Sequence, residues 1–173
     1  MLTSFYEKTK TWGPGSCMVA FYFFSLIPIA ITVALNSYFN GFNLENVIPR
    51  DDIDLFVKSL FFAPWFETLL LNVLLTKIFM VMKVRPINII FAVALIFSCM
   101  HFSNSWYHPL IIFIPALMFQ WHYFLYVEKQ ESGWGFLSTA VLHFLYNFTI
   151  FVVIPLINIV LTIYYGGVGD TLK

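Results

Sequence analysis

Four polar side chains inside apolar segments of this chain carry groups that can hydrolyse an amide bond. They are Glu67, His101, His143 and Asn147. A carboxylate or an imidazole can take a proton from water, and imidazole or amide N–H groups can stabilise the oxyanion that forms on the attacked carbonyl. Such side chains could hydrolyse a peptide bond with activated water, a chemistry that needs no serine or cysteine nucleophile.

Glu67 is the most informative of the four because its surroundings are so apolar. It lies in the middle of an apolar run from Leu55 to Met82. A charge at the centre of a bilayer costs about 2.5–3.5 kcal/mol even on the most lenient scale, so such residues usually face the interior of a helix bundle and have a partner. We expect a histidine on another helix to be that partner.

The spacing of the other polar residues supports a shared site. His143 and Asn147 are four residues apart and so lie on one helical face, and Phe97 and His101 have the same spacing. With a rise of 1.5 Å per residue, Glu67 lies roughly 18 Å along its segment and His143 roughly 14 Å along its own, so the two can meet near mid-membrane. By itself, the His143 and Asn147 pair is also compatible with an interhelical hydrogen-bonding role.

The elements that position these residues follow from composition. Of 173 residues, 60% are hydrophobic, 20% are aromatic and 10% are charged, with a formal net charge of zero. Soluble proteins carry about 25% charged residues, so the composition places the chain in a lipid bilayer. Its length supplies about five spans of roughly twenty residues. The absence of net charge argues against a nucleic-acid partner.

The fold class predicted is all-α, a polytopic membrane helix bundle of about five transmembrane helices in a single domain. A polar stretch separates the first two segments and contains a helix start near residues 49–52. Pro155 lies inside the last segment and predicts a kink or break. The apolar segments run over 17–39, 55–82, 87–103, 109–127 and 134–164.

Orientation follows from the positive-inside rule. The first segment is longer than the apolar region of a signal peptide, which is about 7–15 residues, so we expect it to be retained. The expected location is the bacterial inner (cytoplasmic) membrane with a cytoplasmic N-terminus. This orientation places Lys8, Lys10, Lys77, Lys83, Arg85 and Lys129 inside, and Arg50, Lys58 and Lys173 outside.

The three motifs together resemble the CPBP family, which groups CAAX prenyl endopeptidases with bacteriocin-processing and Abi-type membrane proteins. The motifs are Glu67 after Ala63-Pro64, Phe97-x-x-x-His101 and His143-x-x-x-Asn147. The resemblance covers about residues 55–155, a four-helix family core. Residues 1–54 then form an added span and polar loop, and residues 156–173 form the C-terminal end.

The first motif departs from the family pattern. Thr68 stands where a second glutamate is usual, and Asn72 stands where an arginine is usual. Those two family residues can form an ion pair, and both charges are missing together here. A paired neutral replacement avoids an orphan charge in the membrane. We expect Thr68 to hydrogen-bond to Asn72 in its place.

The resemblance implies a glutamic intramembrane protease. Glu67 and His101 would hold and activate water, while His143 and Asn147 would face the oxyanion. The substrate would be a membrane-embedded or lipid-modified peptide. No cofactor is expected on this interpretation, although zinc held by Glu67, His101 and His143 stays open as an alternative, since such side chains are known zinc ligands.

Other interpretations of the same residues stay open. The alternative function is a proteolytically inactive CPBP-like binding or regulatory subunit with an immunity or partner-stabilising role, and a small transporter is a further one. A membrane-protein partner or a second copy of the chain is compatible with either. His122 is interpreted as structural and Phe97 as a packing residue. Cys17 and Cys99 are interpreted as buried thiols, not a disulfide or metal site.

Overall fold

The computed structural model describes residues 2–40, 53–102, 107–157 and 159–160, and this part of the chain contains helices and turns but no strand. The predicted helix start at residues 49–52 lies outside the described residues. The elements are α1 Leu2–Thr9, α2 Pro14–Asn40, α3 Ile53–Val57, the π-helical η1 Lys58–Phe62, α4 Ala63–Glu67, the π-helical η2 Thr68–Leu75, α5 Thr76–Val81, α6 Pro86–Cys99, α7 His108–Glu128, α8 Ser132–Phe148 and the π-helical η3 Thr149–Val153.

Four helices are long and apolar enough to cross a membrane. The predicted third span, 87–103, is represented by α6, an apolar helix of 14 residues. At 1.5 Å per residue it is about 21 Å long, shorter than the hydrocarbon core of about 30 Å. The described part of the chain is therefore a helical bundle with several helices long and apolar enough to span a membrane, and the count of five spans stays a prediction. The four long helices are Pro14–Leu35, Lys58–Val81, His108–Glu128 and Ser132–Ile157.

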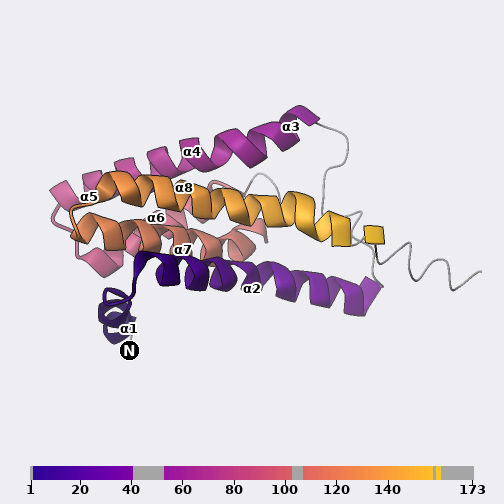
Figure 1. Ribbon diagram of the computed structural model, residues 1–173, viewed down its shortest axis with the longest axis horizontal. Coiled ribbons are helices and arrows are strands. Elements are labelled where there is room, and N and C mark those ends of the chain that lie inside the picture. The colour runs from indigo at the N-terminus through magenta and orange to yellow at the C-terminus, as the bar shows by residue number, and fades with distance from the viewer. Residues whose placement is uncertain (1, 41–52, 103–106, 158, 161–173) are drawn as a thin grey trace, which may run out of the picture.

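The helix α7 is the interior helix of the bundle. It packs against α2, α6 and α8, which lie alongside it in Figure 1. Burial agrees, because 61% of the apolar stretch of α7 is buried against 17% for α2. The second span runs from α3 to α5, and its middle elements η1, α4 and η2 contact α8. Polar side chains of α7 are therefore the ones best placed to meet the second span and α8 together.

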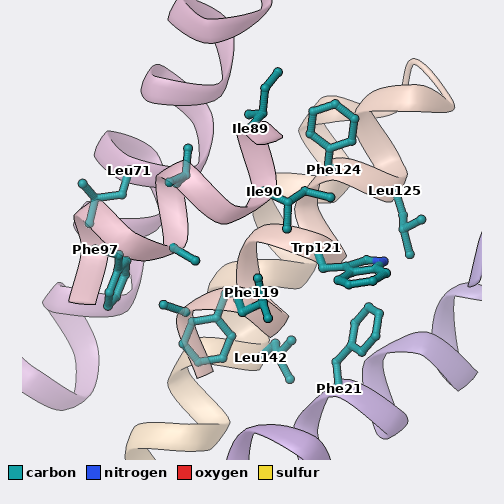
Figure 2. Close-up of a cluster of buried hydrophobic side chains, with 14 of the residues drawn as sticks. Phe21, Leu71, Ile89, Ile90, Phe97, Phe119, Trp121, Phe124, Leu125 and Leu142 are labelled. Atoms are coloured by element: carbon teal, nitrogen blue, oxygen red, sulfur yellow. The ribbon is translucent and has the colours of Figure 1, made fainter. Parts of the chain in front are cut away.

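Large apolar side chains from several helices form one core around α7. Figure 2 shows Phe21 of α2, Ile89 and Ile90 of α6, Trp121 of α7 and Leu142 of α8 in this cluster. Burying such side chains contributes about 1.5–3 kcal/mol each in water, but in a bilayer their main effect is close packing between helices. This packing sets the relative positions of the helices that carry the candidate site.

The last helix does not break at Pro155. It continues through the proline to Ile157, so of the predicted kink or break the break is wrong, and the kink stays a prediction. The irregularity is a π-helical turn, η3, immediately before the proline. A proline removes one backbone donor, and a turn with wider i to i+5 hydrogen bonding takes up the change without ending the helix.

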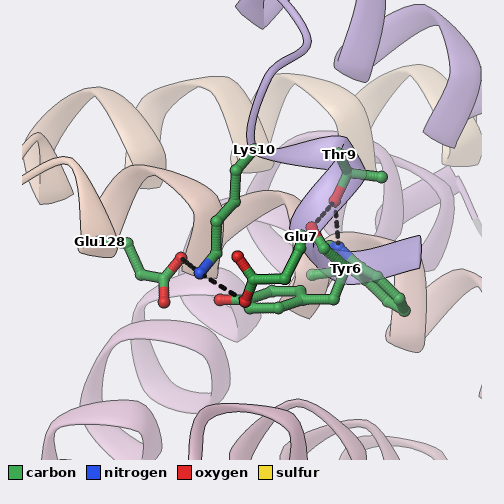
Figure 3. A network of polar contacts seen from close by, with 6 residues as sticks. Tyr6, Glu7, Thr9, Lys10 and Glu128 are labelled. Carbon is green, nitrogen blue, oxygen red and sulfur yellow. Dashed lines mark hydrogen bonds and ion pairs between the residues drawn. The ribbon is translucent and has the colours of Figure 1, made fainter. Parts of the chain in front are cut away.

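The short helix α1, which the hydrophobicity pattern did not predict, closes one end of the bundle. The Lys10 Nζ lies 3.0 Å from the Glu7 carboxylate and 3.1 Å from that of Glu128 on α7, as Figure 3 shows. The Trp121 indole N–H donates to Thr9 Oγ1 at 3.1 Å. These contacts join α1 to the C-terminal part of α7.

The helices alternate in direction, so the α1–α2, α5–α6 and α7–α8 connections lie at the same end of the bundle (Figure 1). The stretches at this end carry most of the basic residues in the described part of the chain, whereas Lys58 begins η1 toward the other end. The predicted orientation rests on this same distribution of lysine and arginine residues between the two ends of the bundle. A cytoplasmic N-terminus stays a prediction.

Candidate functional site

Glu67 lies at the edge of the bundle interior. It is the last residue of α4, directly before the π-helical η2. Trp65 and Phe66 beside it are exposed, whereas Thr68 is fully buried. The side chain of Glu67 itself is 28% exposed. Short π-helical turns often occur at functional sites, and here one begins at the residue after the carboxylate.

The structure brings Glu67 and His143 together, as the sequence predicted. The His143 Nε2 lies 3.7 Å from the Glu67 Oε2, across the interface between the second span and α8. The His143 side chain is 5% exposed. At 3.7 Å the two atoms are within ion-pair range but beyond hydrogen-bond length. One water molecule can therefore contact both groups at the same time.

Aromatic rings hold the His143 imidazole in place. The ring of Phe119 on α7 stacks on it with centroids 4.7 Å apart, and Phe97 on α6 lies at 5.7 Å. The Nδ1 atom of His143 is buried and has no hydrogen-bond partner in the described part of the chain. Packing thus orients this ring, with Nε2 toward Glu67.

His101 meets the site through Phe97. Its ring stacks on Phe97 at 5.2 Å and on His108 at 5.9 Å, and its Nδ1 is 2.9 Å from the Phe97 carbonyl oxygen. Phe97 is buried and contacts both His101 and His143, as expected of a packing residue. The shared role of Glu67 and His101 in holding water stays a prediction.

Asn147 joins α8 to the second span. Its Nδ2 donates to the backbone carbonyl of Ser59 in η1 at 2.8 Å. This bond is the interhelical role that the sequence left open for the residue. An amide nitrogen carries two N–H groups, and the bond to Ser59 uses one of them.

The expected hydrogen bond between Thr68 and Asn72 is wrong. Asn72 Nδ2 donates to Gln120 Oε1 on α7 at 2.8 Å, and Gln120 Nε2 donates to Thr76 Oγ1 at 2.6 Å. The Thr68 Oγ1 is buried without a partner in the described part. The Asn72 amide thus donates to a side chain of a facing helix, Gln120, and not to a neighbour on its own helix. The two residues are 48 positions apart, so local spacing does not reveal the contact.

Gln120 is the residue that the sequence analysis missed. It is fully buried in α7, two residues before the buried His122. The rule that identified Glu67, an unexpected polar group at membrane depth, applies to Gln120 as well. We call the contacts of Asn72, Gln120 and Thr76 the amide ladder.

Two further predictions concern residues around the site. His122 is buried, and its Nε2 lies 3.1 Å from Ser138 Oγ, which agrees with a structural role. Cys17 and Cys99 are free thiols, and Cys17 is buried as expected. Cys99 is exposed, so its predicted burial is wrong. It lies at the end of α6 on an outward face, where lipid or solvent replaces protein contacts.

The described residues contain no group of three His, Cys, Asp or Glu side chains arranged to hold a metal ion. Glu67, His101 and His143 all belong to the described part, so they are not gathered as a ligand set in this geometry. The arrangement they do form is a carboxylate and an imidazole facing each other, with aromatic rings around the imidazole.

Comparisons of the chain with models of protein families, with curated proteins and with solved structures each found no match.

Proposed function

We propose that the protein is an intramembrane endopeptidase of the CPBP type that hydrolyses a peptide bond with water activated by Glu67. The observation that carries the proposal is the approach of Glu67 to His143 at 3.7 Å, between two helices that are long and apolar enough to span a membrane. An intramembrane carboxylate with a histidine partner is a functional site by default, because the bilayer makes it expensive as a structural element.

In the proposed reaction, the Glu67 carboxylate takes a proton from water while the water oxygen bonds to the carbonyl carbon of the substrate. The carbonyl π electrons move to its oxygen, and a His143 N–H donates to this oxyanion. When the intermediate collapses, the C–N bond breaks and the leaving nitrogen takes the proton from Glu67. His101 would help to hold the water, as the family resemblance implies.

The surroundings of Glu67 support a membrane-embedded or lipid-modified peptide as substrate. The exposed face of the second span next to it carries a shallow apolar hollow with a lysine at its far end. A substrate that diffuses within the bilayer can approach the partly exposed carboxylate along this face. The residues around the hollow are Phe66, Leu69, Leu70, Val73, Leu74 and Lys77.

The test is a comparison of membrane peptides in cells that carry the wild-type chain or the Glu67→Gln variant. Glutamine keeps the shape of the side chain but cannot accept the proton, so new peptide termini should appear with the wild type alone. Glu131→Gln is the matched control, because Glu131 is an exposed carboxylate in the α7–α8 turn. Identical termini from the wild type and Glu67→Gln, with both proteins present and folded, would refute the protease proposal.

A specific observation favours the second candidate, a proteolytically inactive binding or regulatory subunit. Asn147, a donor in the resemblance, bonds to the Ser59 carbonyl, and the usual charges at positions 68 and 72 are replaced by neutral side chains in and beside the amide ladder. Under this alternative, Glu67→Gln alters the binding of a membrane partner and leaves all peptide termini unchanged. Co-purification of partners with the two forms separates the candidates.

A further inference from the structure

Five buried polar atoms of the second span and α8 have no hydrogen-bond partner in the described part of the chain. The second span contributes Thr68 Oγ1 and Asn72 Oδ1, and α8 contributes Thr139 Oγ1, His143 Nδ1 and the Tyr146 hydroxyl. All five side chains are buried within the described part of the chain. Buried polar groups are normally hydrogen-bonded, so a cluster of unpaired ones on facing helices needs a ligand that can donate and accept.

The register of the two helices places Thr68 and Thr139 at a similar level. Phe56 contacts Phe151 and Phe61 contacts Phe144, so numbers rise along one helix as they fall along the other. Glu67 facing His143 continues the same antiparallel register. Thr68 therefore lies near the level of Thr139, one helical turn from His143, and η2 packs against α8.

The amide ladder extends this polar region away from Glu67. Asn72 uses its nitrogen for Gln120, which leaves its Oδ1 as an acceptor, and Gln120 continues to Thr76. Along the helices, the polar groups thus follow in the order of the Glu67 and His143 pair, then Thr68 and Thr139, then the amide ladder. This order points toward the bundle end where α5 finishes.

We propose that this region binds a short internal row of water molecules between the second span, α7 and α8. Water both donates and accepts, so it can donate to the Thr68, Asn72 and Thr139 oxygens and accept from the Tyr146 hydroxyl. Internal waters typically make about three hydrogen bonds to otherwise unsatisfied buried groups. The row does not depend on the proposed function, although in a hydrolase it supplies the reacting water to Glu67.

Hydroxyl-radical footprinting of the full chain in lipid nanodiscs tests the row, because radicals formed from bound water oxidise the side chains beside it. Phe119 and Phe21 are the matched pair, with exposures of 1% and 0%. Phe119 stacks on His143 within the proposed row, whereas Phe21 packs against Trp121 and His122, where the His122 Nδ1 is unpaired but no row is proposed. We expect Phe119 to be oxidised several-fold faster than Phe21. Equal rates would overturn the proposal.

Substitutions that keep side-chain shape complete the test. Thr68→Val and Thr139→Val remove hydroxyls from the row and should lower the oxidation of Phe119 toward that of Phe21. Ser98→Ala is the control, because the buried Ser98 hydroxyl already donates to the Ala94 carbonyl and should not affect Phe119. Unchanged labelling in both valine variants would contradict the row. Glu67→Gln is expected to keep the labelling of Phe119. The labelling therefore tests the water row and the loss of peptide cleavage tests the protease proposal, so either can fail without the other.

Discussion

Glu67, which faces His143, and Asn72, which begins the amide ladder, lie five residues apart on the second span. Their polar groups nevertheless make different contacts. The ladder is closed in the sense that Asn72, Gln120 and Thr76 are fully buried and joined directly by bonds of 2.8 and 2.6 Å, with the Asn72 Oδ1 left unpaired. The pair is open, because its atoms are 3.7 Å apart and the Glu67 side chain is 28% exposed. Closed contacts hold helices together, whereas an open pair leaves room for a reactant.

This difference separates structural polar groups from reactive ones in a helical membrane protein. Polarity at membrane depth identified Glu67 and applies equally to Gln120, so polarity alone does not decide the role. A direct bond between helices decides it: a side chain that makes a hydrogen bond to a facing helix holds the two helices together. His122, bonded to Ser138, belongs with the ladder, and His143 belongs with Glu67.

The largest effect should come from replacing the two buried histidines in turn. His143→Gln removes the imidazole that faces Glu67 and should lower peptide cleavage by roughly 10²–10⁴-fold. His122→Gln removes a structural contact and should leave cleavage per folded molecule nearly unchanged. Cleavage rates of the two purified variants, normalised to folded protein, provide the measurement. Similar losses in both would erase the distinction between open and closed contacts.

The next effect should be on stability. Gln120→Leu leaves the Asn72 amide and the Thr76 hydroxyl without their ladder partner, and should lower the free energy of unfolding by about 1–3 kcal/mol. Met118→Leu, an apolar exchange on the same helix, serves as the control. Unfolding in mixed micelles followed by circular dichroism measures both. If Gln120→Leu is as stable as the control, the ladder contributes nothing to helix packing.

A smaller effect is expected at Asn147. Asn147→Ala removes the bond to the Ser59 carbonyl and should cost about 0.6 kcal/mol, the average for interhelical hydrogen bonds in membrane proteins. Cleavage by the folded variant should persist. A fall of roughly 10²–10³-fold in turnover at unchanged stability would assign Asn147 to the oxyanion instead, as the family resemblance implies.

The smallest effect concerns the charged contacts of α1, at the end of the bundle. Burial, followed by the neighbouring Glu128 and Glu7 carboxylates, raises the pKa of Tyr6. Burial lowers the pKa of Lys10, but its hydrogen bonds to Glu7 and Glu128 outweigh this and raise the pKa. Tyr6 and Lys10 are both groups that lie outside the four long apolar helices.

Because both pKa values are raised on folding, their stabilising contribution is complete below the ordinary values of 10.0 and 10.5 and is lost as the pH rises through the folded values. We expect α1 to loosen only above about pH 10, with a change in tryptophan fluorescence from Trp121. Tyr6→Phe removes one titrating group and should reduce the change. Loosening that begins near neutral pH would contradict this account.

Much of the fold could be predicted from the sequence because it depends on local pattern. Long apolar runs form helices in a bilayer, where each backbone group must be satisfied within its own segment. The same reasoning located Glu67 in the second span and His143 in the last. It overlooked α1, whose length of 8 residues and mixed polarity resemble a loop more than a span.

The sequence alone determined that polar side chains are buried in apolar helices, and that Glu67 needs a partner. Only the tertiary structure decided which groups meet. It paired Glu67 with His143, gave Asn72 to Gln120 instead of Thr68, and directed Asn147 to Ser59. The physical reason is that hydrogen bonds depend on ångström-scale distances between residues far apart in the chain, 88 positions in the case of Asn147 and Ser59. Helix packing around α7 sets those distances, and periodicity within one helix does not.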